Sequence, residues 1–101
     1  MKNKVEVRAN YIKRHCESRG VKVQCTKHSK PIDFISITNG KGDIASVSEK
    51  CATYEPALYA PEWSEYMKNW ARLEGFSEKQ ISEQNLIRNV ELGEAIDLLT
   101  S

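Results

Sequence analysis

The sequence contains no apolar run long enough to cross a bilayer, since a transmembrane helix needs roughly 20 consecutive apolar residues. The first residues carry charge and lack the apolar core of a signal peptide. No internal repeat or low-complexity segment is visible. With 40% apolar and 29% charged residues, the composition is typical of a folded globular chain. At 101 residues we therefore expect one small cytoplasmic domain without a membrane partner.

Cysteine is scarce and its count is odd: the chain has only Cys16, Cys25 and Cys51. An odd count in a chain without an export signal disfavours a disulfide framework and favours reduced thiols. Cys25 and Cys51 fall on the expected apolar face of a sheet, and Cys16 falls on the apolar stripe of a helix. We therefore expect all three to be small buried hydrophobic residues.

Complete metal or catalytic motifs are also lacking. Cys25 and His28 have the spacing of half a zinc site, but the second pair that a structural site needs is missing. His15 and Cys16 are adjacent on a helix and would point about 100° apart. A thiol–imidazole pair would require the fold to bring a cysteine and a histidine together. We predict a non-enzymatic protein without metal, cofactor or catalytic residues, and a thiol or metal enzyme remains the open alternative.

The clearest structural pattern is a β-hairpin over residues 32–51. A three-residue loop, Gly40–Gly42, aligns the apolar faces of its arms by pairing Ile37 with Ala45 and Ile35 with Val47. A two-residue loop would mix apolar and polar positions. In the three-residue loop, Gly42 would take the positive φ that typically ends a loop of this length. Gly40–Gly42 could also offer N–H groups to a phosphate, but phosphate loops normally lie between a strand and a helix.

Before the hairpin, apolar residues spaced by three and four predict an amphipathic helix over residues 3–19, ended by Gly20. Val21, Val23 and Cys25 then alternate with polar residues and predict a strand. The helix should cover the apolar face of a three-stranded antiparallel sheet. The opposite face is either covered by the C-terminal half or exposed as a binding patch. It carries the side chains of Ile32, Phe34 and Ile44.

The C-terminal half predicts two helices after a linker at residues 52–61. The first begins at Pro61 and ends near Glu74. Ser77 and Gln80 form a capping box that opens the second, which runs toward Leu99 with a possible interruption at Gly93. The fold class is therefore α+β, a single domain over residues 1–101. It divides into a basic helix plus sheet (1–51), the linker (52–61) and an acidic helical part (62–101).

Charge is segregated along the chain although the net charge is only +1. Residues 1–30 hold nine basic and two acidic side chains, and the other 71 residues hold six basic and twelve acidic ones. This asymmetry favours a small regulatory or adaptor protein whose basic part binds nucleic acid or a nucleic-acid-handling complex. Tyr11 is the only Phe, Trp or Tyr among residues 1–30, so base stacking has little support there. The expected phosphate contacts are Arg8, Lys13, Arg14, Lys22 and Lys27.

The alternative function is a protein inhibitor or assembly factor that acts through the acidic, aromatic C-terminal helices. The last helix has apolar residues on two sides, which favours self-association as a homodimer through that helix. The expected protein-interface residues are Phe34, Trp63, Trp70, Leu92 and Ile96.

Overall fold

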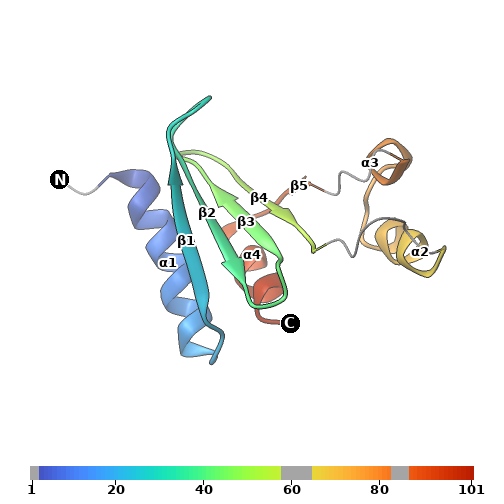
Figure 1. Ribbon diagram of the computed structural model, residues 1–101, viewed down its shortest axis with the longest axis horizontal. Helices are drawn as coiled ribbons and strands as arrows, with labels where there is room; N and C mark the ends of the chain where they lie inside the picture. The colour runs from blue at the N-terminus through green and yellow to red at the C-terminus, as the bar shows by residue number, and fades with distance from the viewer. Residues whose placement is uncertain (1–2, 58–64, 83–86) are drawn as a thin grey trace.

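The computed structural model describes residues 3–57, 65–82 and 87–101, and it has the predicted α+β architecture (Figure 1). One helix precedes an antiparallel sheet, and three shorter helices follow in the C-terminal half. The elements are α1 (Lys4–Ser18), β1 (Val23–His28), β2 (Phe34–Asn39), β3 (Ile44–Val47), β4 (Ala52–Glu55), α2 (Glu65–Leu73), α3 (Glu78–Ser82), β5 (Arg88–Asn89) and α4 (Leu92–Leu99).

The sheet has five strands in the order β1-β2-β3-β4-β5, so the prediction of three strands was wrong. β4 occupies the first part of the segment that was predicted to be a linker, where it pairs with β3. β5 lies within the segment predicted to be a long helix and pairs with β4 over two residues. Ala52 and Tyr54 are the only residues of β4 that point into the core, so its apolar alternation is too short to stand out in the sequence.

The β2–β3 hairpin confirms the predicted register. Ile37 pairs with Ala45 and Ile35 pairs with Val47, and all four side chains are buried. Gly42 has a φ of 88°, a conformation that a residue with a Cβ adopts only with strain. Two buried apolar pairs and one glycine at positive φ thus specify this register together.

The predicted N-terminal helix is confirmed as α1. The Asn3 side chain accepts a hydrogen bond from the Val5 N–H at 2.7 Å and caps its first turn. The helix ends before Gly20, which has a φ of 80°. The residues that α1 buries are those of the predicted stripe: Val5, Ala9, Ile12 and Cys16.

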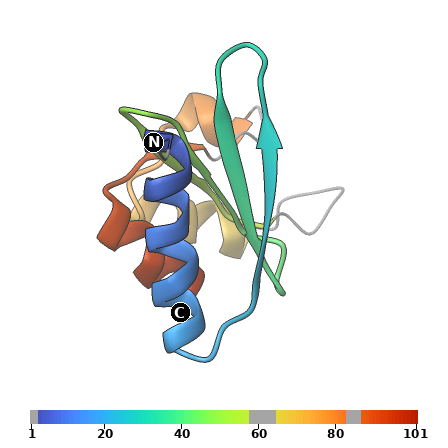
Figure 2. The same ribbon diagram turned by 90° about the vertical axis from the view of Figure 1, so that its left-hand side faces the viewer.

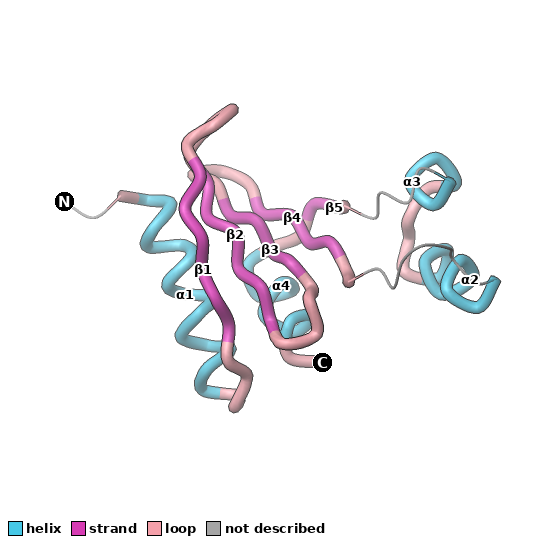
Figure 3. The backbone as a smooth tube through the Cα atoms, viewed as in Figure 1, coloured by secondary structure: helices cyan, strands magenta, loops and turns pink. Residues whose placement is uncertain are grey.

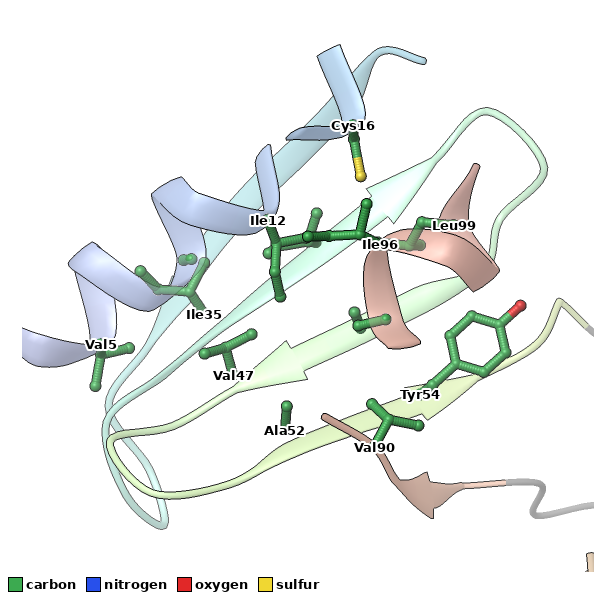
Figure 4. Packing of buried hydrophobic residues seen from close by; sticks show 14 residues of the cluster. Val5, Ile12, Cys16, Ile35, Val47, Ala52, Tyr54, Val90, Ile96 and Leu99 are labelled. Atoms are coloured by element: carbon green, nitrogen blue, oxygen red, sulfur yellow. The ribbon is translucent and has the colours of Figure 1, made fainter. Parts of the chain in front are cut away.

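Helices α1 and α4 lie on the same face of the sheet, and the main core fills the space between them and the strands (Figures 2 and 4). Cys16 is buried there, as predicted. Cys25 and Cys51 are exposed, so the expectation that they are buried was wrong. Cys25 points toward the helix layer, but β1 is the edge strand and the layer does not cover it. Cys51 follows β3 in the turn before β4.

The first predicted C-terminal helix is present as α2 and ends at Leu73, close to the predicted end at Glu74, whereas the second is divided into α3, β5 and α4 (Figure 3). The predicted capping box is confirmed, since the Gln80 N–H donates to Ser77 Oγ at 3.1 Å and the Ser77 N–H donates to Gln80 Oε1 at 3.0 Å. The helix that it opens is only α3, so the prediction of one helix from there toward Leu99 was wrong. The start predicted for the preceding helix, at Pro61, lies outside the described residues. A second small core joins α2 and α3 through Ala71, Phe76 and Ile81.

Candidate nucleic-acid interface

The face of the sheet opposite α1 and α4 has no helix packed against it in the part of the chain that the structure describes (Figure 1). We call it the open face. From the sequence, this face was either covered by the C-terminal half or exposed as a binding patch. The described helices do not cover it. Its side chains come from alternate positions of all five strands: Gln24, Thr26, His28, Phe34, Ser36, Thr38, Ile44, Ser46, Thr53, Glu55 and Asn89.

Five uncharged polar side chains form one row across the open face. Each is directly opposite the next in the strand pairing, so the row runs perpendicular to the strands. Four hydroxyl residues and one amide make up this row, which we call the hydroxyl row: Thr26, Ser36, Ser46, Thr53 and Asn89. Hydroxyl and amide groups both donate and accept hydrogen bonds, so the row can bind polar groups of either kind.

His28 and Phe34 stack on each other at one end of the open face. They are directly opposite in the pairing of β1 with β2, and their ring centroids are 4.4 Å apart with the planes 12° from parallel. His28 Nε2 lies 3.0 Å from Ser36 Oγ, a contact that fixes the imidazole in this position. Cys25 and His28 are three residues apart in a strand and therefore project to opposite faces, so they do not form the half zinc site considered from the sequence.

Two exposed lysines flank β1 at its two ends. Lys22 lies just before the strand, and Lys30 lies in the loop that follows it. Neither makes a salt bridge with a described residue. Glu55 is the only carboxylate among the side chains of the open face named above. The unpaired cations beside this face that are named here therefore lie at the two ends of β1.

The structure does not gather the predicted phosphate contacts on one face. The Arg8 Nε donates to the Ser48 carbonyl at 3.0 Å, and Lys27 forms an ion pair with Glu6. Both bonds lie on the helix-bearing side of the sheet. The other three predicted contacts, Lys13, Arg14 and Lys22, make no salt bridge with a described residue. Of the five, only Lys22 lies at an end of the strand that borders the open face.

The predicted protein-interface residues are equally dispersed. Phe34 lies on the open face, while Trp70 lies against the small α2–α3 core with its ring centroid 6.3 Å from that of Phe76. Leu92 is partly buried against the main core. Ile96 is only 3% exposed, so its assignment to an interface is corrected: it is a core residue of α4. Trp63 lies outside the described residues.

A second polar cluster, which the sequence did not predict, is buried beside the β2–β3 turn. The Asp43 Oδ2 accepts a hydrogen bond from Asn39 Nδ2 at 3.0 Å, and its Oδ1 accepts one from the Ala57 N–H at 2.8 Å. The Asn39 amide also donates to the Leu99 carbonyl at 2.9 Å. Burial, together with the charge and hydrogen bond of Asp43, raises the pKa of Tyr54 above its ordinary value. This cluster links the hairpin to α4 and to the end of β4.

The juxtaposition of His28 with Phe34 could not be predicted from the sequence, because only the pairing of β1 with β2 reveals it. The alternation of polar residues in each strand was the available signal for the hydroxyl row.

Over the described ranges, no cluster of three or more His, Cys, Asp or Glu side chains could hold a metal ion. No helix within those ranges is long and apolar enough to span a bilayer. Comparisons with protein-family models, curated proteins and solved structures find no match.

Proposed function

We propose that this chain is a non-enzymatic protein that binds single-stranded nucleic acid on its open face. The observation that carries the proposal is the stacked pair of His28 and Phe34 on a sheet face that no helix among the described residues covers. Aromatic rings on an exposed sheet are a general platform for unpaired bases, and each stacked base contributes about 1–3 kcal/mol. The exposed side of the pair offers a base a third position in the stack.

The hydroxyl row supports the same proposal. Unpaired bases and sugars present donors and acceptors along their edges, and the row from Thr26 to Asn89 presents both kinds of group. Since these side chains are short and uncharged, a strand can lie close to the sheet without displacing long side chains. The row extends across all five strands and could follow several nucleotides.

Lys22 and Lys30 would supply phosphate contacts. With few cations at this face, the salt-dependent part of the affinity is small, because each neutralised phosphate of a single strand contributes about −0.7 to the slope of log K against log salt. We therefore expect stacking to account for much of the affinity. Nucleic-acid binding was the function favoured by the charge segregation, but the surface proposed here is largely different from the one on α1.

The test is fluorescence anisotropy of labelled single- and double-stranded DNA and RNA at low and physiological salt. We expect single strands to bind more tightly than duplexes, and Phe34→Ala to weaken binding about tenfold. The matched control is Tyr11→Ala, which removes an exposed aromatic ring from α1 and should leave binding unchanged.

A second pair of variants separates the two surfaces. Lys22→Ala/Lys30→Ala should lower the affinity and the salt slope, whereas Lys13→Ala/Arg14→Ala should have little effect. If the α1 variant alone abolished binding, the helix layer would be the interface and the open-face proposal would be wrong. Absence of binding at low salt would reject both surfaces.

The alternative, a protein inhibitor or assembly factor, is favoured by one observation on α2. Leu73 is 87% exposed, an unusual position for a large apolar side chain beside the half-buried Trp70. Under this proposal a purified target should bind the wild-type chain and lose most of its affinity for Leu73→Glu. Phe34→Ala should leave that affinity unchanged, which distinguishes this function from binding on the open face.

A further inference from the structure

The free edge of β1 is the second surface that the fold leaves without a partner. β1 is the first strand of the sheet, and it pairs only with β2 among the described residues. All its side chains from Gln24 to His28 are exposed. An unpaired edge exposes backbone N–H and C=O groups that readily pair with another strand.

The hairpin shows which backbone groups face this edge. The Asn39 N–H donates to the Asp43 carbonyl and the Asn39 carbonyl accepts from the Gly42 N–H, so both groups of Asn39 point toward β3. Because the direction of the backbone N–H and C=O groups alternates along an antiparallel strand, those of Thr38, Ser36 and Phe34 point toward β1. Their partners on β1 are Gln24, Thr26 and His28. The groups that face the free edge are therefore those of Val23, Cys25 and Lys27.

We propose that two copies of this chain pair through their β1 edges, antiparallel, about a two-fold axis at Cys25. In this register Cys25 lies opposite Cys25 of the second copy, and Val23 lies opposite Lys27 of the second copy. Each of these pairs can exchange an N–H···O bond in both directions. The contact is isologous, as a closed dimer requires, and it joins the two sheets into one. The pairing of the two edges does not require nucleic acid.

The charges of the edge are compatible with this register. Lys27 is the only cationic residue among the three that face the edge, and it lies opposite the apolar Val23 of the second copy. Its ammonium group is already drawn toward Glu6 on its own α1, away from the free edge. A register centred on Lys27 would instead place two lysines opposite each other, which is unfavourable. The small uncharged thiol of Cys25 occupies the centre without steric or electrostatic conflict.

Two further features favour a second copy at this edge. The pairing of β1 with β2 is continuous over six residues, and β1 has no proline or bulge that would block another strand. In addition, α4 does not offer the free apolar side on which self-association was first predicted, because Ala95, Ile96 and Leu99 are buried in the core. The interface of a homodimer is therefore more consistent with the β1 edge than with α4.

The first test is sedimentation equilibrium of the wild-type chain, Cys25→Lys and Cys25→Glu, each alone and as an equimolar mixture. Wild type should dimerise, and each variant alone should weaken dimerisation about tenfold because like charges meet at the axis. The mixture should restore association through opposite charges. Thermal unfolding confirms that the variants fold, since position 25 is exposed.

The second test is cross-linking of the wild-type thiols with a short bismaleimide. Cys51 is also exposed but lies between β3 and β4 and not on β1, so it is the matched control. Cys51→Ser should keep the cross-linked dimer and Cys25→Ser should lose it. A monomeric wild type, a mixture that fails to restore association, or a dimer that cross-links only through Cys51 would each overturn the proposal. A wild-type chain that captures foreign strands while remaining monomeric would also overturn it.

Discussion

Asn39 and Asp43 bind each other inside the β2–β3 turn, with the Asn39 Nδ2 donating to Asp43 Oδ2 at 3.0 Å and both side chains less than a tenth exposed. The Asn39 Oδ1 also accepts hydrogen bonds from the N–H groups of Lys41 and Asp43, each at 3.0 Å. A buried polar pair is stabilising only when its hydrogen bonds are satisfied. The three bonds named here for these two residues, together with those to Leu99 and Ala57, meet that condition.

Replacing Asp43 should therefore be strongly destabilising. Asp43→Ala leaves the Ala57 N–H without its acceptor and removes one of the two acceptors of the Asn39 amide. We expect a loss of about 3 kcal/mol in the free energy of unfolding, measured by urea denaturation. Asp33→Ala, at an exposed carboxylate, is the control and should change stability by less than about 0.5 kcal/mol. Equal effects from the two variants would contradict a structural role for the buried cluster.

The raised pKa of Tyr54 predicts how stability responds to alkaline pH. Burial, then the charge and hydrogen bond of Asp43, favour the neutral phenol in the folded state. The folded state thus holds its proton where the unfolded state releases it, so stability should fall as pH rises above about 10, the ordinary tyrosine pKa. Urea denaturation from neutral to alkaline pH measures this. Tyr54→Phe should lessen the decline, while Tyr11→Phe should not.

Two glycines should respond in opposite directions to the same substitution. Gly42→Ala places a Cβ at a φ of 88°, where it would also lie 3.4 Å from the Ala57 Cβ. We expect a loss of about 1–2 kcal/mol in thermal unfolding experiments. Gly93 lies in the first turn of α4 with nothing near the added Cβ, so Gly93→Ala should increase stability by about 0.5 kcal/mol. Loss of stability in both variants would show that α4 requires Gly93 for another reason.

Arg88 should link the small α2–α3 core to the rest of the fold. Its guanidinium lies 3.1 Å from Glu94 Oε2 and 5.8 Å from the centre of the Phe76 ring, while its Nε is buried without a hydrogen-bond partner among the described residues. Arg88→Met removes both contacts, and we expect faster hydrogen exchange in α2 and α3 with unchanged protection in α1. Arg19→Ala removes the exposed pair with Asp97 and the hydrogen bond to Thr100 Oγ1, neither of which involves α2 or α3, and should leave exchange in α2 and α3 unchanged. Uniformly faster exchange across the chain would contradict this local role.

Local patterns determined the parts of the fold that depend on neighbouring residues. The 3–4 spacing of Val5, Ala9 and Ile12 specified α1, and the Ser77–Gln80 box specified the start of α3. The hairpin register also followed from the sequence, because a one-residue slip would expose the apolar side chains of both arms. In each case one short segment contained its own stabilising contacts.

Only the tertiary structure decided the rest. β4 pairs with the edge that β3 leaves and β5 pairs with the edge that β4 leaves, and no periodicity in these short segments reveals either pairing. The sequence placed Cys25 on the helix-bearing face but could not show that its strand lies at the edge, where the helices leave it exposed. His28 and Phe34 meet only because β1 pairs with β2 in one register. The proposed binding surfaces depend on strand neighbours, which are contacts between distant segments.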